Sequence, residues 1–97
     1  MRTVRWNKLA RLDYFQNISY LQQNWSEKDA QNFIDKVFEI ENMLAKGNVE
    51  FQNTDRVGIK RCVINKQISL FYRVVDDRNI ELLRFWNNNM NSKNLNL

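Results

Sequence analysis

The sequence has a single cysteine, no histidine and only two glycines among its 97 residues. Cys62 cannot form a disulfide within the chain, and without a second cysteine or a histidine it offers no metal-ligand spacing. We therefore expect no bound metal and no cofactor, and a protein that works in a reducing compartment.

Long apolar runs are also missing. No stretch approaches the roughly 18 to 20 apolar residues that a transmembrane helix needs. The first 15 residues are basic, but they have no uninterrupted apolar core and no small-residue cleavage site, so they do not resemble a secretory signal. These absences predict a cytoplasmic protein that makes no membrane contact.

The apolar residues that are present suffice for one core. The chain is 43% hydrophobic and contains three Trp, three Tyr and six Phe. A length of 97 residues leaves no room for two ordinary cores. We expect a single domain over residues 1–97.

Charge is unevenly spread along the chain, although the net value is only +4. Residues 1–12 hold four bases and no acid, residues 26–55 hold seven acids against three bases, and residues 56–97 hold eight bases against three acids. Basic ends of this kind attract polyanions or an acidic protein partner. A solvated surface without a partner is the alternative interpretation.

The first half of the chain predicts a short strand and two helices. Residues 3–6 alternate in polarity, and Asn7 is a suitable N-cap for the helix that follows. Ser26 and Asp29 resemble a capping box at the start of a second helix, and Gly47 is placed to end it. The first helix has apolar residues at near-helical spacing: Leu9, Leu12, Tyr14, Phe15, Ile18, Leu21 and Trp25. The second is expected to bury Ala30, Phe33, Ile34, Val37, Phe38 and Leu44.

The second half changes to a period of two and predicts three strands, at 57–64, 67–75 and 79–86. Asn65-Lys66 and Asp77-Arg78 fit two-residue hairpin turns, although neither contains glycine. The predicted fold is therefore α+β in the order β-α-α-β-β-β, with the helical hairpin packed on one face of a small, mainly antiparallel sheet. Residues 87–97 form an Asn-rich tail, either flexible or ordered by a partner.

These turns imply a register for the hairpin strands. With two-residue loops, Lys60 pairs with Phe71, Cys62 with Ser69, and Phe71 with Arg84. The face packed on the helices would then carry Val57, Ile59, Val63, Ile68, Leu70, Tyr72, Val74, Leu83 and Phe85. The opposite face would carry Lys60, Cys62, Ser69, Phe71, Arg73, Arg84 and Trp86.

Cations and aromatic rings on one surface indicate a binding face. Arg61 falls on the core side in this register, where it must reach an edge or pair with Glu81. One extra residue in a turn would move a whole strand's side chains to the other face. The predicted binding residues are Lys60, Arg61, Phe71, Arg73, Arg84 and Trp86.

Three strand motifs carry a resemblance to a known family. They are Gly58-Ile59-Lys60-Arg61, Leu70-Phe71-Tyr72-Arg73-Val74 and Ile80-Glu81-Leu82-Leu83-Arg84. With the β-α-α-β-β-β order over residues 3–86, this pattern resembles the RelE/ParE toxins of type II toxin-antitoxin modules, most closely the ParE-like branch. The resemblance implies a growth-inhibiting toxin, of the plasmid-stabilisation kind, that a cognate antitoxin neutralises.

The resemblance leaves two mechanisms open. RelE-like members cleave messenger RNA on the ribosome without a metal, whereas ParE-like members inhibit DNA gyrase. At the positions where RelE-like nucleases carry two arginines, this chain has Ser69 and then Asn87 or Asn88, and no tyrosine follows Trp86. These departures favour the ParE-like activity.

The side-chain chemistry agrees with that preference. Metal-independent RNA cleavage needs a base, a cation for the developing charge and an acid. Lys60, Arg73 and Arg84 could stabilise charge and are the candidate catalytic residues, but only Lys60 could act as a base. We therefore expect a non-enzymatic inhibitor. The alternatives are a metal-independent endoribonuclease and an inactive toxin-like fold that binds protein or nucleic acid.

Overall fold

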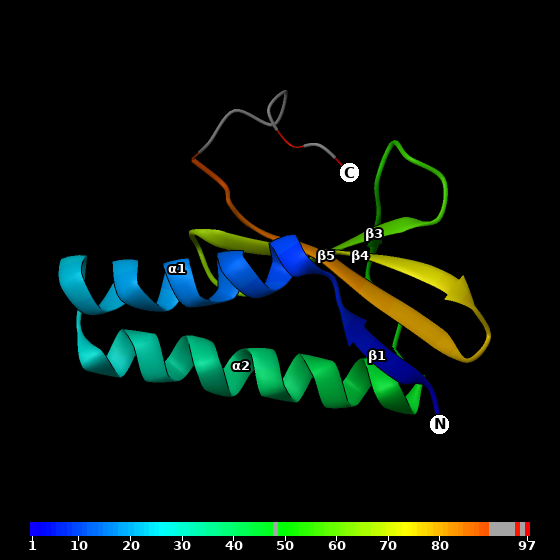
Figure 1. Ribbon diagram of the computed structural model, residues 1–97, viewed down its shortest axis with the longest axis horizontal. Coiled ribbons are helices and arrows are strands. Elements are labelled where there is room, and N and C mark those ends of the chain that lie inside the picture. Colours follow the sequence, from blue (N-terminus) through cyan, green and yellow to red (C-terminus); the bar gives the residue numbers. More distant parts are fainter. Residues whose placement is uncertain (48, 90–94, 96) are drawn as a thin grey trace.

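A helical hairpin and a five-stranded sheet form the two layers of the protein, seen in a computed structural model that describes residues 1–47, 49–89, 95 and 97 (Figure 1). The sheet has the order β1-β5-β4-β3-β2, in which only the β1–β5 pair is parallel. The predicted α+β class and element order are confirmed; β2 is an additional short edge strand. The elements are β1 (Thr3–Trp6), α1 (Lys8–Asn24), α2 (Glu27–Lys46), β2 (Gln52–Asn53), β3 (Ile59–Val63), β4 (Ile68–Asp76) and β5 (Asn79–Asn87).

The helix ends follow the predicted caps. The Asn7 Oδ1 atom accepts a hydrogen bond from the Ala10 N–H at 2.7 Å, and the Ser26 Oγ atom accepts one from the Asp29 N–H at 3.0 Å. Gly47 ends α2 with φ +77°, a left-handed conformation that favours glycine. Local sequence chemistry therefore sets both helix starts and the end of α2.

The helices bury narrower faces than their apolar residues suggest. On α1 the buried side chains are Ala10, Asp13 and Leu21, while Leu9, Leu12 and Phe15 are exposed. On α2 the prediction for Phe38 is wrong, because this residue is 65% exposed and Ile40 is buried instead. Phe38 lies about 140° around the helix from Phe33, off the stripe that faces the sheet.

The register predicted for β3 is wrong by one residue. The Ile64 and Asn65 N–H groups both donate to the Ile68 carbonyl, and the Asn65 side chain accepts from the Gln67 and Ile68 N–H groups. The loop thus has three residues, and every side chain of β3 lies on the face opposite to the predicted one. Lys60 pairs with Tyr72, Arg61 with Phe71, and Cys62 with Leu70.

The consequences of this shift are visible in burial. Cys62 is in the core at 2% exposure, whereas Val63, predicted to be in the core, is 53% exposed. Val57, also predicted to be in the core, is 104% exposed because it lies in the turn before β3. Arg61 lies on the face away from the helices. The correction removes Lys60 and Cys62 from the predicted binding face and places Arg61 on it.

The second hairpin has the predicted Asp77-Arg78 loop. The Asp76 carboxylate accepts from the Arg78 N–H at 2.8 Å and from the Asn79 side chain; these bonds lower the pKa of Asp76 and hold a turn that has no glycine. Phe71 pairs with Arg84 and Ser69 with Trp86, as predicted. Leu83 has no partner, because a bulge lies between the Phe71–Arg84 and Tyr72–Leu82 pairs.

The bulge changes which β5 residues face the helices. Ile80, Leu82 and Phe85 belong to the core, in place of the predicted pair Leu83 and Phe85. β5 runs through Asn87, so the predicted tail begins later, and residues 90–94 and 96 of that tail lie outside the described residues. Within the described part of the chain, no helix is long and apolar enough to cross a membrane.

The buried thiol gives a prediction about reactivity. Burial raises the pKa of Cys62 to about 11, so at pH 8 its thiolate fraction is about 100-fold below that of a thiol at the ordinary value of 9.0. We expect maleimide to label native Cys62 at least ~100-fold more slowly than an exposed cysteine introduced as Val57→Cys, and equally fast in denaturant. Mass spectrometry over time measures this. Rapid labelling of native Cys62 would contradict the corrected register.

Candidate functional site

The sheet surface away from the helices gathers most of the predicted binding residues. We call it the open face and define it by Arg61 of β3, Ser69, Phe71 and Arg73 of β4, and Arg84 and Trp86 of β5. Arg61, Phe71 and Arg84 form one cross-strand row. The predicted row contained Lys60 in the place that Arg61 holds.

Lys60 lies apart from the open face. It pairs with Tyr72, whose ring is buried in the core, and its ammonium group donates to the Asn53 side chain. Residues directly opposite each other in an antiparallel pair share a face, so Lys60 is on the helix side of the sheet. It therefore does not join Arg73 and Arg84.

Arg84 is held by a buried carboxylate at one edge of the open face. Its Nε and Nη2 atoms donate to the two oxygens of Asp13 at 2.6 and 3.0 Å. The Asp13 side chain is only 10% exposed and that of Arg84 17%. The guanidinium also lies 5.0 Å from the Trp86 ring centroid, in a cation–π contact. Sequence reasoning missed Asp13, because a lone acid on a helix does not reveal its partner.

Arg61 is part of a second polar cluster. Its Nε atom donates to the Ser69 Oγ atom at 3.1 Å and its Nη2 atom to the Asn88 side chain at 3.3 Å. The Ser69 hydroxyl in turn donates to Asn88 Oδ1 at 2.7 Å, and Ser69 is fully buried. Two of the three cations on the open face are thus bonded within the protein, while Arg73 is exposed.

A depression of about 360 Å³ opens beside these residues. Arg61, Phe71 and Trp86 form part of its wall, together with Asn88 and the β2–β3 loop. Leu95 also lines it and is 7% exposed. An aromatic surface with a guanidinium beside it suits a protein side chain or a planar group.

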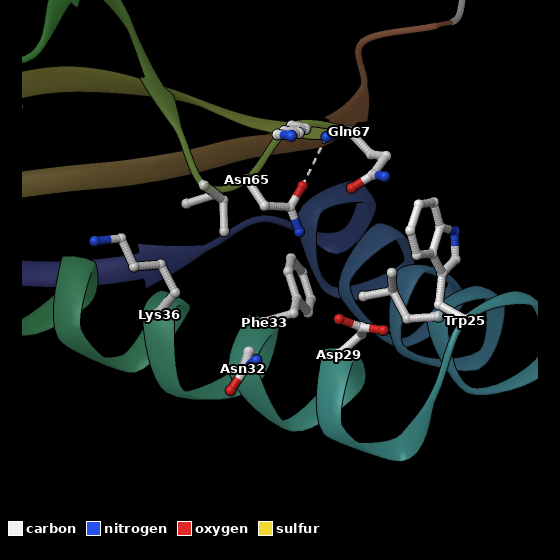
Figure 2. A pocket seen from close by; sticks show the side chains of 10 residues that line it. Trp25, Asp29, Asn32, Phe33, Lys36, Asn65 and Gln67 are labelled. Atoms are coloured by element: carbon white, nitrogen blue, oxygen red, sulfur yellow. Dashed lines mark hydrogen bonds between the residues drawn. The ribbon is translucent and has the colours of Figure 1, made fainter.

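A second depression, of about 440 Å³, lies between the helix joint and the β3–β4 loop (Figure 2). Figure 2 shows Phe33 at its centre, Trp25 and Asp29 at the helix joint, and Asn65 reaching in from the loop. The Asn65 side chain is already bonded to the Gln67 N–H, and the Asp29 carboxylate accepts from Ser26. This depression therefore has fixed polar groups that serve the turn and the helix cap.

An exposed apolar stripe runs along α1. Leu9, Leu12 and Phe15 are 45%, 49% and 61% exposed. Lys8 and Arg11 lie on the same helix, and the one acid of α1, Asp13, is turned inward to Arg84. Sequence reasoning noted the helical spacing of these apolar residues but did not predict that they are exposed. The arrangement suits an acidic partner with an apolar face.

Comparisons with known proteins find one family model that matches. It describes the ParE toxin of the type II toxin-antitoxin system parDE and covers residues 4–92. A search among curated proteins gives no match.

Solved structures share the fold. A structure of the chromosomal ParDE toxin-antitoxin system from P. aeruginosa has a TM-score of 0.71 at 16% identity, covering 90% of this chain and 96% of that one. The YoeB dimer from Staphylococcus aureus gives 0.58 at 20%, covering 88% and 94%. The E. coli DinJ-YafQ complex gives 0.61 at 10%, covering 90% and 93%. At these identities the similarity is one of fold.

The Asp13–Arg84 pair gives a prediction about stability. We expect Asp13→Asn to lower the free energy of unfolding by about 3 to 5 kcal/mol, because the guanidinium stays buried without its counter-charge. Asparagine retains an acceptor oxygen, so the substitution tests the charge. Urea denaturation at pH 7 measures the change.

The exposed pair Lys36–Glu39, with its charged atoms 3.8 Å apart, provides the matched control. Glu39→Gln should cost below about 1 kcal/mol, since exposed pairs contribute little. If Asp13→Asn costs no more than the control, the pair does not hold α1 against β5.

Proposed function

The chain belongs to the ParE toxin family of type II toxin-antitoxin systems, and we propose that it inhibits growth as a non-enzymatic inhibitor of DNA gyrase in the cytoplasm. It acts by binding, with the open face as the contact surface. A cognate antitoxin neutralises it by covering the toxin.

One observation supports binding over nuclease chemistry. Where RelE-like nucleases carry two arginines, this chain has Ser69 and then Asn87 or Asn88, and the side chains of Ser69 and Asn88 are bonded to each other at 2.7 Å. Ser69 is fully buried, so its hydroxyl is not presented as an attacking group. The cation at this place is Arg61, whose guanidinium is already bonded to Ser69 and Asn88. These bonds leave that charge less available to a reacting phosphate.

The remaining catalytic candidates support the same choice. Arg84 is held by Asp13, and Lys60, the one base considered, lies on the helix side bonded to Asn53. A general base must lie within hydrogen-bond reach of the proton that it removes. Arg73 alone among these three is an exposed cation on the open face, which suits contact with a protein surface.

We assign the antitoxin-binding surface to the α1 stripe. Leu9, Leu12 and Phe15 offer an apolar strip with a basic border. An amphipathic acidic segment would bury these side chains and pair with Lys8 or Arg11. Antitoxin complexes occur among the structural neighbours, such as DinJ-YafQ and YoeB-YefM.

The target assignment predicts the outcome of a supercoiling assay. Purified protein should inhibit supercoiling by gyrase, and Arg73→Glu should raise the half-inhibitory concentration about tenfold, equal to about 1.4 kcal/mol. Lys60→Glu is the matched control, because the same charge reversal lies off the open face.

A ribosome-dependent transcript-cleavage assay accompanies this measurement. Undisturbed gyrase together with cleaved transcript would establish the nuclease instead. Equal loss of inhibition in both variants would show that the open face is not the contact surface.

The antitoxin assignment predicts a separation of toxicity from neutralisation. Phe15→Glu should weaken antitoxin binding by about 2 kcal/mol, roughly thirtyfold, and leave toxicity intact, because the substitution places a charge in the apolar stripe. Phe38→Glu, at 65% exposure on α2, is the control for an exposed phenylalanine elsewhere.

Growth after induction with and without the neighbouring antitoxin gene, and calorimetry of the purified pair, measure both effects. Full neutralisation of Phe15→Glu would exclude the α1 stripe as the antitoxin surface.

A further inference from the structure

Part of the segment that follows β5 lies on the open face. Leu95 is 7% exposed and lines the depression that Arg61, Phe71 and Trp86 help to form. The Leu97 carbonyl accepts a hydrogen bond from Arg56 at 3.1 Å. In Figure 1 the red end of the trace accordingly lies beside the β2–β3 loop. Two contacts, one apolar and one polar, thus hold this segment against the sheet.

The burial of Trp86 requires such a cover. In a two-layer fold, the sheet face opposite the helices meets water unless something lies on it. Trp86 is on that face, yet it is only 7% exposed. The Arg84 guanidinium lies 5.0 Å from the ring centroid, and Leu95 lines the same depression as Trp86. Leucine burial against an aromatic ring is favourable because it removes apolar area from water.

The cover is nevertheless incomplete. A depression of about 360 Å³ remains beside Leu95. Among the described residues, the Trp86 indole N–H is buried without a hydrogen-bond acceptor. A buried donor without a partner is costly. A ligand with an aliphatic side chain and a suitably placed carbonyl or carboxylate would therefore fit the open face better than Leu95 does.

We propose that Leu95 and Leu97 are an internal competitor for the open face, occupying the seat of an extended segment of the protein target. The target segment presents an aliphatic side chain to Phe71 and Trp86, and an acceptor to the Trp86 N–H. The proposal rests on the proposed function only in naming gyrase as the target. The seat favours protein over nucleic acid, because it accepts an aliphatic side chain and because Arg61 and Arg84 are already bonded within the protein.

Competition has a measurable consequence. The apparent affinity for the target is reduced by the fraction of molecules whose face is uncovered. If the cover is in place nine-tenths of the time, its removal strengthens binding on the order of tenfold. Leu95→Asp should remove it, since burying an unpaired carboxylate in the depression that Phe71 and Trp86 line is costly.

The cover itself is tested by fluorine NMR on protein labelled with 5-fluorotryptophan. The three tryptophans give three resonances, and Trp86→Phe assigns one of them. In Leu95→Asp the solvent isotope shift of Trp86 should rise toward that of Trp25, which is 56% exposed. The Trp6 resonance, which reports the fold, should not move. Leu95→Met and Val57→Asp are the controls and should keep the wild-type shift.

A peptide supplied in trans tests the seat. A synthetic peptide of residues 90–97 should return the Trp86 shift of Leu95→Asp to the wild-type value, whereas the same peptide carrying aspartate at position 95 should not. An unchanged Trp86 shift in Leu95→Asp, or no response to the peptide, would overturn the proposal.

Gyrase binding completes the test. Leu95→Asp should bind gyrase about tenfold more tightly than wild type. Weaker binding would instead make Leu95 part of the interface and overturn the competition. If no variant binds gyrase, wild type included, the target assignment fails, and the Trp86 shift together with the peptide still decides whether the seat exists.

Discussion

The rest of the structure depends on how the edge of β5 is completed beyond the point where its pairing with β1 ends. β1 pairs with β5 only as far as Leu82, so the next stretch of β5 has an open edge. Two side chains of α1, one turn apart, complete it: Asp13 accepts from the Phe85 N–H at 3.1 Å, and Asn17 donates to the Phe85 carbonyl at 3.1 Å. An unpaired strand edge is otherwise a site for aggregation, and buried backbone groups need partners. The helix thus replaces a strand, and its position against the sheet follows.

This arrangement determines which charges remain for binding. Because Asp13 lies at the β5 edge, it also attracts Arg84 from the open face, and that arginine becomes structural. Because Asp13 is turned inward, the charged residues on the outside of α1, beside the apolar stripe, are all basic. One buried carboxylate therefore shapes two surfaces: an open face with Arg73 as its exposed cation, and a basic, apolar helix surface. Arg84 therefore serves the structure through its pair with Asp13, whereas Arg73 remains available for recognition.

Local patterns predicted the elements well, and the misses have identifiable physical causes. The caps at Asn7, Ser26 and Gly47 are local and were predicted. The β3 register was not, because Asn65 can close a two-residue or a three-residue loop, and its side-chain bonds to two N–H groups select the longer one. The bulge at Leu83 and the exposure of the α1 stripe depend on how α1 meets β5, an interaction between residues about 70 positions apart. Arg73, Arg84, Phe71 and Trp86 were placed together from sequence because the Asp77-Arg78 loop was predicted with the right length.

The fold by itself says little about activity in this superfamily, since structures from ParDE, YoeB and DinJ-YafQ share it at 10% to 20% identity. Activity must then depend on the few side chains that face outward from the common sheet. In this chain Ser69 and Asn88 bond to each other across β4 and the end of β5, which closes one part of the open face, while Phe71 and Trp86 leave another part apolar. A surface that is closed at its polar end and aromatic at its other end offers shape and apolar area more than free charge. That balance is the reason for proposing that the protein acts by protein contact.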